Sequence, residues 1–289
     1  MSILEVKEVK KTYTTRLGSN RVEALKNVSF SVEQGEYVAI MGESGSGKTT
    51  LLNILAALDK PTGGSVILGG QDLGRIRESA VAAFRRDNLG FVFQDFNLLD
   101  TFTLEDNIYL PLVLAGKRHD EMQARIVPIA KQLGITELLK KYPYEVSGGQ
   151  KQRAAVARAL ITGPKLVLAD EPTGALDSRA TDELLRLFGG INQTGQTILM
   201  VTHSVKAASH AGRVLFIRDG EVFHQIYRGS GTNEQLYQKI SDTLTLLATQ
   251  PGGAGTKPQG MEAQPEALPQ TKPQAARENG PMAGEEGRI

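Results

Sequence analysis

The chain has 289 residues, of which 40% are apolar and 22% charged, with no cysteine and a formal net charge of +1. This length and composition are typical of a soluble globular protein with one or two domains. The near-zero charge gives no support to a nucleic-acid partner or to an anionic membrane surface, and the lack of cysteine excludes a disulfide framework and a cysteine-based zinc site.

Targeting and membrane-spanning segments are not visible in the sequence. The first residues, Met-Ser-Ile-Leu-Glu-Val-Lys, lack the apolar core of a secretion signal. No run of about 18 apolar residues occurs that could cross a bilayer. We therefore expect a cytoplasmic protein whose membrane association comes through a partner.

The N-terminal part predicts strands followed by a helix. Val28, Phe30 and Val32 alternate with polar residues, as in a half-buried strand, and a Gln-Gly turn follows. Residues 37–41 are continuously apolar and short, which is typical of a fully buried strand. This strand runs directly into a glycine-rich loop, and the apolar residues 51–58 beyond it have the length of a helix.

The glycine-rich loop between that strand and that helix predicts a phosphate site. Residues 42–49 read Gly-Glu-Ser-Gly-Ser-Gly-Lys-Thr, the phosphate-loop pattern. Glycines let backbone N–H groups turn toward a phosphate, and a helix N-terminus favours negative charge. In this pattern the lysine reaches the β- and γ-phosphates and the first threonine holds Mg²⁺. The residues expected to bind the nucleotide here are Gly42, Ser44, Gly45, Ser46, Gly47, Lys48, Thr49 and Thr50.

The middle of the chain changes from strand-like to helical patterns. Residues 121–133 and 149–161 have helical spacing, and the whole stretch of about 98–160 contains few strand-like runs. Strand patterns return at 166–169 and 197–201, with a helical segment between them. The sequence thus predicts an α/β core with a mostly parallel sheet, interrupted by a helical insertion.

Two acidic residues follow the apolar segment 166–169. Asp170 would lie at the carboxyl end of that strand, where ligands sit in open α/β sheets, and is expected to be a Mg²⁺ partner. Glu171 could orient or deprotonate an attacking water. Alternatively, Asp170 and Glu171 are two surface acids in a turn without a catalytic role. The phosphate-loop pattern in the same chain favours the catalytic interpretation.

The C-terminal part contains a hairpin, a helix and a tail of different composition. Asp-Gly at 219–220 separates two strand-like runs and tolerates the positive φ of a tight turn. Thr232 and Gln235 predict a capping box that opens a last helix, ending near Ala248. Residues 251–289 contain 6 Pro and 7 Gly with almost no large apolar side chain, so we expect residues 249–289 to be disordered.

Several further signals are weak alone. Ser147, Gly148, Gly149 and Gln150 could simply cap a helix. Gln94 could be a loop amide, His203 a core histidine and Tyr13 a strand residue. Their order along the chain, together with the phosphate loop and Asp170-Glu171, resembles the ATP-binding subunit of an ABC transporter over about residues 1–248. Val146 stands where the family more often has leucine.

This resemblance implies the nucleotide-binding domain of an ABC protein, with a RecA-like core, an antiparallel β-subdomain and a helical insertion. Two copies would pair head to tail around two ATP molecules, so that the serine motif of one covers the γ-phosphate held by the other. The family pattern then places Gln94 on Mg²⁺ and the attacking water and His203 on the γ-phosphate. It also places Tyr13 on the adenine and Asp177 at the dimer interface.

The resemblance also implies a membrane permease as partner. In the family, the permease's coupling helix docks just after the position of Gln94, so the subunit works at the cytoplasmic face of the membrane. Alternatively, apolar residues there belong to the core, and we expect a mixture of exposed and buried side chains. These residues are Phe96, Leu98, Leu99, Phe102 and Ile108.

Three stretches are most similar to the mechanotransmission branch of the family, namely 12–18, Phe93-Gln-Asp-Phe-Asn-Leu-Leu-Asp100 and 172–177. Within that branch, residues 201–210 and 213–220 look most like the Bce-type subunits of resistance to bacitracin and lantibiotics. Peptide resistance, with or without signalling to a sensor histidine kinase through the permease, is therefore the first hypothesis. The alternatives are lipoprotein release or macrolide export, and a nucleotide-dependent switch in cell division.

Overall fold

The computed structural model describes residues 1–14 and 21–249, which fall in one compact unit. The predicted tail and part of the 12–18 stretch lie outside the described residues. Among the described residues, no helix combines the length and apolar character needed to cross a bilayer.

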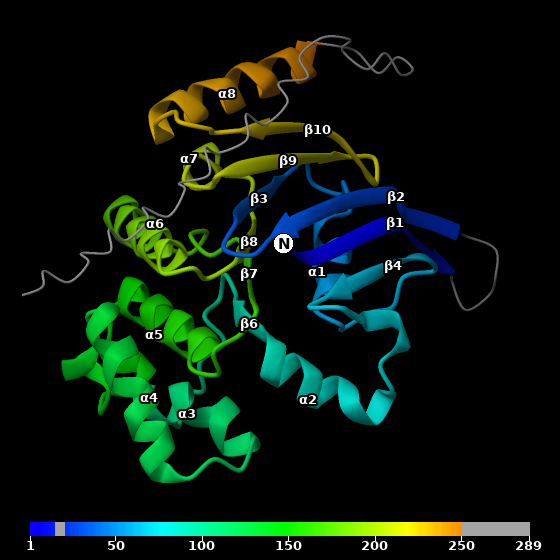
Figure 1. The fold of residues 1–289 in the computed structure, drawn as a ribbon. Coiled ribbons are helices and arrows are strands. Elements are labelled where there is room, and N and C mark those ends of the chain that lie inside the picture. Colours follow the sequence, from blue (N-terminus) through cyan, green and yellow to red (C-terminus); the bar gives the residue numbers. More distant parts are fainter. Residues whose placement is uncertain (15–20, 250–289) are drawn as a thin grey trace, which may run out of the picture. The chain divides into compact units, whose positions relative to one another are not determined.

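Within the described residues, ten strands form one sheet in the order β5-β4-β1-β2-β10-β9-β3-β8-β7-β6 (Figure 1). The neighbours from β9 to β6 in this order are all parallel. The β1–β2, β1–β4, β4–β5 and β9–β10 pairs are antiparallel. The predicted α/β fold with an antiparallel part is thus confirmed. The strands are β1 (Ser2–Thr14), β2 (Arg21–Glu33), β3 (Tyr37–Met41), β4 (Gly63–Leu68), β5 (Gln71–Asp72), β6 (Leu89–Val92), β7 (Leu166–Asp170), β8 (Ile198–Val201), β9 (Arg213–Arg218) and β10 (Glu221–Tyr227).

Helices α3, α4 and α5 lie between β6 and β7 along the chain, although these two strands are neighbours in the sheet. The helices expected at 121–133 and 149–161 form within a few residues of these limits, and the helical segment expected before β8 is also present. The domain limits 1–248 and the insertion limits 98–160 stay predictions. The helices are α1 (Lys48–Leu55), α2 (Glu78–Asn88), α3 (Leu104–Leu114), α4 (His119–Gln132), α5 (Gly148–Leu160), α6 (Ser178–Gln193), α7 (Val205–Ala208) and α8 (Asn233–Thr249), with short 3₁₀ turns at Leu73–Arg75, Thr136–Leu138 and Pro143–Glu145.

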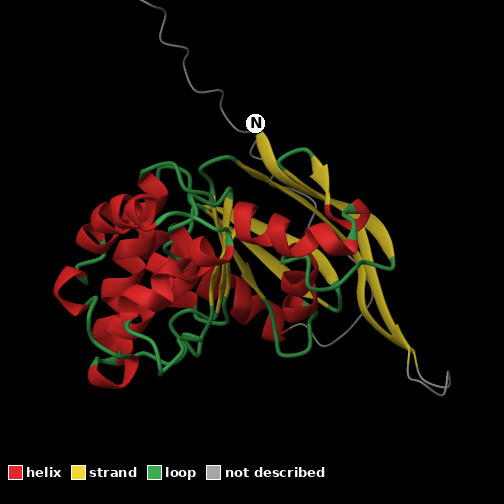
Figure 2. Ribbon diagram, turned by 90° about the horizontal axis from the view of Figure 1, so that it is seen from below, coloured by secondary structure: helices red, strands yellow, loops and turns green. Residues whose placement is uncertain are grey.

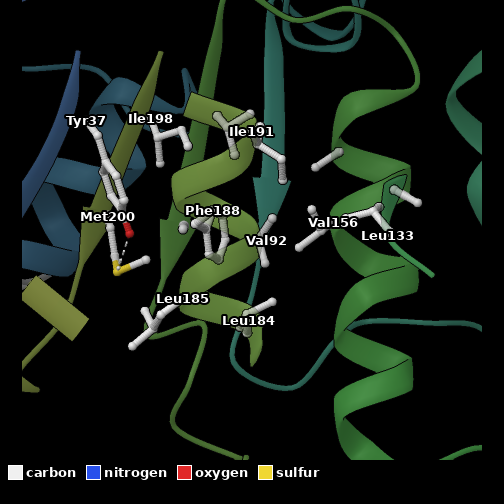
Figure 3. Close-up of a cluster of buried hydrophobic side chains, with 14 of the residues drawn as sticks. Tyr37, Val92, Leu133, Val156, Leu184, Leu185, Phe188, Ile191, Ile198 and Met200 are labelled. Carbon is white, nitrogen blue, oxygen red and sulfur yellow. Dashed lines mark hydrogen bonds between the residues drawn. The ribbon is translucent and has the colours of Figure 1, made fainter. Parts of the chain in front are cut away.

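The parallel strands are buried on both faces, because alternate side chains enter two different apolar clusters. In β3, Ala39 belongs to the cluster that contains Phe188 of α6, while Ile40 belongs to the cluster that contains Leu51 of α1. Figure 3 shows Phe188 lying between α6 and the strands, close to the Tyr37 ring. Figure 2 shows most helices gathered on one side, with the long antiparallel strands extending away from them.

Two local C-terminal predictions are confirmed. Asp219 and Gly220 have φ values of 49° and 78°, as the turn between β9 and β10 requires. Thr232 caps α8 in both directions, because its hydroxyl accepts from Gln235 N and its N–H donates to Gln235 Oε1.

The strand order decides where the site lies. β3, β8, β7 and β6 are consecutive in the sheet and parallel. Each is followed at its carboxyl end by one of the sequence signals: the phosphate loop, His203, Asp170-Glu171 and Gln94. Parallel strands bring their carboxyl ends to one edge, so signals more than 100 residues apart in sequence meet there.

Candidate active site

The phosphate loop turns sharply between β3 and α1, and two of its glycines are required by close neighbours. Gly47 has φ 101°, and a Cβ added there would lie 2.6 Å from the carbonyl oxygen of Ala24. A Cβ on Gly42 would lie 2.2 Å from the carbonyl oxygen of Ile217. These contacts hold the loop against β2 and β9, and only glycine permits them.

The start of α1 is suited to an anion. Gly47 is its N-cap and makes no side-chain capping bond, and the first turn contains no acidic residue. The first turns of α5, α6 and α7 also lack acids, whereas those of α2, α3, α4 and α8 contain them. A helix N-terminus carries partial positive charge, so α1 keeps that charge available to an external phosphate.

Polar groups of the loop fit a phosphate ligand. The ammonium of Lys48 donates to the carbonyl oxygens of Gly42 (2.8 Å) and Glu43 (2.7 Å), which holds it over the loop. Burial lowers the pKa of Lys48, and the carboxylates of Glu171 and Asp170 oppose that shift. The Ser46 hydroxyl is buried and, among the described residues, has no hydrogen-bond partner. A phosphate oxygen would supply the missing acceptor.

The carboxylate of Glu171 is held by the segment that follows β8. Its Oε2 accepts from the Thr202 hydroxyl (3.1 Å), and its Oε1 accepts from the His203 backbone N–H (2.9 Å). The His203 ring nitrogen Nδ1 also lies 2.8 Å from Oε1. Glu171 itself adopts φ 45°, a left-handed conformation that is costly for a residue with a side chain. This pairing, which spans 32 residues, fixes the direction of the carboxylate.

Asp170 lies at the end of β7 and is partly buried. Burial and the neighbouring charge of Glu171 raise its pKa, while Lys48 lowers it. A cation would relieve the electrostatic cost of this pair of acids, which is consistent with the expected Mg²⁺ site. Among the described residues, no group of three or more His, Asp or Glu forms a metal cage. Mg²⁺ bound to a nucleotide usually takes only one or two ligands from the protein.

Gln94 lies against the turn that follows Glu171. A Cβ added to Gly174 would be 2.8 Å from Gln94 Cδ, so the amide packs directly on that turn. The same turn is closed by a bond from Gly174 N to Glu171 O (2.9 Å). The structure therefore brings Gln94 and Glu171 to one place, as their predicted roles require.

Tyr13 lies at the edge of the site, beside the end of α1. Its hydroxyl donates to Asp59 Oδ2 (2.8 Å), and the ammonium of Lys11 lies 4.8 Å from the ring centroid. Burial raises the pKa of the Tyr13 phenol, and a hydrogen bond with Thr50 opposes that rise. The residue is 42% exposed. Its role as an adenine platform stays a prediction.

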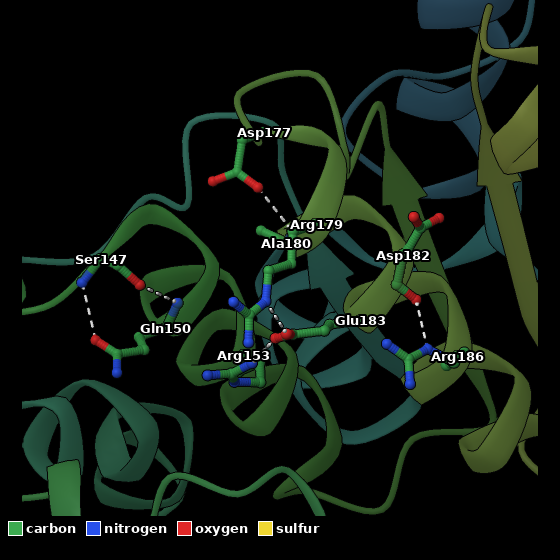
Figure 4. Close-up of polar contacts among 9 residues, drawn as sticks. All are labelled: Ser147, Gln150, Arg153, Asp177, Arg179, Ala180, Asp182, Glu183 and Arg186. Atoms are coloured by element: carbon green, nitrogen blue, oxygen red, sulfur yellow. Dashed lines mark hydrogen bonds and ion pairs between the residues drawn. The ribbon is translucent and has the colours of Figure 1, made fainter.

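The serine motif forms the capped start of α5 (Figure 4). Ser147 Oγ accepts from Gln150 N (3.3 Å), and Gln150 Oε1 accepts from Ser147 N (2.9 Å). Asp177 caps the neighbouring α6 by accepting from Ala180 N (2.8 Å). Among the described residues, the hydrogen bonds of this motif stay within α5, and those of the Lys48 ammonium stay within the phosphate loop. The starts of α1 and α5 both lack first-turn acids, as the predicted head-to-tail dimer requires.

Two residues of α5 that sequence reasoning missed contact residues 93–97, the Gln94 loop. Gln152, which is fully buried, donates to the Phe93 and Pro172 carbonyl oxygens. Arg158 donates to the carbonyl oxygens of Phe96 and Asn97. Only Gln152 had a signal in the sequence. It is a polar residue on the apolar face of an amphipathic helix, three residues before the buried Ala155.

Comparison with known proteins settles the family. The sequence profile described as "ABC transporter" matches residues 25–174. The chain belongs to the ABC transporter family. As an ABC protein it is the ATP-binding subunit of a transporter, and such subunits are ATPases that dimerise and work with membrane permeases.

Individual ABC proteins resemble the chain over most of its length. The ABC transporter ATP-binding protein YxdL of Bacillus subtilis is 50% identical over 247 residues, covering 85% of this chain and 95% of that protein. The bacitracin export ATP-binding protein BceA of Halalkalibacterium halodurans is 45% identical over 248 residues, covering 86% and 97%. Among solved structures, the ATP-binding cassette MJ0796, dimeric and bound to ADP and Pi, is 38% identical with a TM-score of 0.70, covering 78% of this chain and 98% of that one.

Proposed function

We propose that two copies of this ABC ATPase close around two Mg²⁺–ATP complexes and drive a permease that protects the cell from wall-targeting antimicrobial peptides. The observation that carries the catalytic part is the Glu171 carboxylate, held by Thr202 and His203 beside the phosphate loop. The peptide-resistance part is supported by the similarity to BceA, a bacitracin export protein, over 86% of this chain.

In this proposal, one group of residues holds the phosphates and another holds Mg²⁺. The backbone of residues 42–47 and Lys48 would hold the phosphates, and Ser46 would donate to a phosphate oxygen. Thr49, Gln94 and Asp170 offer the hydroxyl, amide and carboxylate oxygens that Mg²⁺ prefers. When bound, the ion neutralises charge that develops on the phosphate oxygens.

Glu171 would accept a proton from the attacking water at its carboxylate. His203 and Thr202 orient that carboxylate. The His203 side chain is 75% exposed, which leaves it accessible to a phosphate. The Ser147–Gln150 helix start and Asp177 of the partner copy would complete the site. Tyr13 would stack on the adenine.

The permease is expected to bind beside the Gln94 loop, at the cytoplasmic face of the membrane. Leu99 and Phe102 are 45% and 41% exposed, whereas Ile108 is fully buried. The expected mixture of exposed and core residues is thus present, and the two exposed side chains offer an apolar contact for a coupling helix. Signalling to a sensor histidine kinase would pass through the permease.

A growth-inhibition panel on a strain lacking the gene tests the proposal. The strain is complemented with wild type, Glu171→Gln or Leu99→Asp, and exposed to bacitracin, a lantibiotic, a macrolide and a detergent. Selective sensitivity to the wall-targeting peptides that only wild type rescues supports the proposal. Unchanged peptide sensitivity with macrolide sensitivity would instead indicate macrolide export, and altered cell shape alone would indicate the division switch.

A further inference from the structure

Gln152 contacts both the Gln94 loop and residues 171–174, the Glu171 turn. It lies in the first turns of α5, and none of its surface is exposed. Its Nε2 donates to the carbonyl oxygen of Phe93 at 3.0 Å and to that of Pro172 at 2.6 Å. Phe93 directly precedes Gln94, and Pro172 directly follows Glu171. One amide group thus holds the backbone beside both residues.

This amide continues a connection that the sheet cannot make. β6 and β7 pair up to Val92 and Ala169, after which the ladder ends. Beyond Val92 the chain forms the Gln94 loop, whereas β7 continues to Asp170, which still pairs with Val201 of β8 before the Glu171 turn begins. Because backbone pairing between β6 and β7 has stopped there, the Gln152 side chain supplies hydrogen bonds that join the two segments.

The same helix holds the far side of the Gln94 loop. Arg158 donates to the carbonyl oxygens of Phe96 and Asn97, two consecutive residues with φ 61° and 49°. Left-handed conformations persist in residues with side chains only when the surroundings enforce them. Gln152 and Arg158 therefore fix the loop on both sides of Gln94.

Packing alone does not account for Gln152. Its Oε1 is buried and, within the described residues, has no hydrogen-bond partner. A methionine of similar length would fill the space without burying an unpaired oxygen. The residue type is better explained by its two donated bonds.

We propose that Gln152 is a positioning residue for ATP hydrolysis, which rests on the proposed roles of Gln94 and Glu171. It holds the Gln94 loop and the Glu171 turn at a fixed distance from each other. It also ties both to α5, whose N-terminal Ser147 is expected to meet the nucleotide of the partner copy. A shift of α5 at the dimer interface is thereby carried to this chain's own hydrolytic residues.

The test is steady-state ATPase kinetics of the full chain with Gln152→Met, which removes both donors at similar volume. We expect kcat to fall at least about tenfold while KM changes less than about threefold, because nucleotide binding does not use Gln152. In the Glu171→Gln background, ATP-dependent dimerisation should persist. Unchanged kcat in a folded Gln152→Met protein overturns the proposal.

A matched control is available at the opposite edge of the sheet. Gln196 also donates through Nε2 to two carbonyl oxygens, those of Pro164 and Thr197, just before β7 and β8 begin. Gln196→Met makes the same chemical change away from the site and should leave kcat within about twofold of wild type. An equal loss of kcat in both variants would show a general stability effect and overturn the proposal.

A double-mutant cycle with Gln94→Ala separates positioning from an independent effect. If Gln152 acts through the Gln94 loop, adding Gln152→Met to Gln94→Ala should lower kcat by less than about threefold more. Multiplicative losses would contradict the proposal. If Gln152→Met fails to fold, Gln152→Asn retains the amide but withdraws it by one methylene, and full activity of that variant would overturn the proposal.

The single Glu171→Gln variant separates the proposed catalytic role of Glu171 from the positioning role of Gln152. Undiminished turnover by Glu171→Gln removes the catalytic assignment and the Gln152 proposal with it. Loss of turnover in Glu171→Gln, combined with normal kcat in Gln152→Met, removes only the role of Gln152.

Discussion

His203 lies against the carboxylate of Glu171, with its Nδ1 2.8 Å and its backbone nitrogen 2.9 Å from the same oxygen, Oε1. The other oxygen accepts from the Thr202 hydroxyl. Both carboxylate oxygens are therefore engaged by the segment that follows β8, and the acid cannot rotate freely. A general base held in this way can be aimed at a water molecule before the reaction begins.

Replacing Glu171 by glutamine should preserve binding and abolish turnover. The amide has the shape of the carboxylate but cannot accept a proton at neutral pH, so kcat should fall at least about a hundredfold. ATP affinity should change little, and an ATP-bound dimer should accumulate, visible by light scattering. Glu121→Gln in α4, which changes an acid away from the site, is the control. A Glu171→Gln protein that turns over like wild type would falsify the catalytic role.

Removing the His203 ring should reduce kcat without unfolding the protein. His203→Ala keeps the backbone N–H to Glu171 but loses the ring contact, and the expected loss in kcat is about a hundredfold. The His203 side chain is 75% exposed, so the melting temperature should hardly change. His119→Ala is the matched control, and it should keep full activity. Equal kcat in both variants would argue against the assignment.

Neutralising Asp170 should stabilise the fold while removing activity. Burial and Glu171 raise the pKa of Asp170, so the folded chain binds a proton more readily than the unfolded chain. Stability from this group is highest below the ordinary aspartate pKa and is lost as pH rises through the raised value. At neutral pH the ionised side chain therefore costs stability, which Asp170→Asn relieves.

The measurement is a pair of thermal melts in Mg²⁺-free buffer. The melting temperature of Asp170→Asn should exceed that of wild type at neutral pH, by roughly 2–4 °C for each kcal/mol relieved. The difference should shrink in acid, where wild-type Asp170 is protonated. A lower melting temperature for the variant at neutral pH would contradict this reasoning.

Ending the chain after Gln250 should leave ATPase activity unchanged. The 39 residues beyond that point contain 13 Pro and Gly and almost no large apolar side chain, a composition from which we expect no contribution to a core. We expect kcat, KM and melting temperature within error of the full chain. A large loss of activity on truncation would show that the tail belongs to the working fold.

Much of the fold and site was predictable because local signals agreed. The alternation in β2, the apolar run of β3 and the Asp-Gly turn before β10 depend on neighbouring residues alone. The phosphate loop needs only its own glycines and the helix that follows. The order of the remaining signals then identified the family, and the sequence profile agrees.

The sequence by itself determined which chemical groups the protein has and the order in which they occur. The tertiary structure decided how these groups meet. Glu171 pairs with His203 because β7 and β8 are neighbours, and Gln152 reaches Phe93 and Pro172 because α5 packs against β6. Hydrogen bonds between residues 20 to 60 positions apart leave no local pattern, since they depend on strand order and helix packing. The left-handed conformation of Glu171 is likewise invisible in the sequence, because no glycine marks it and only the surrounding contacts enforce it.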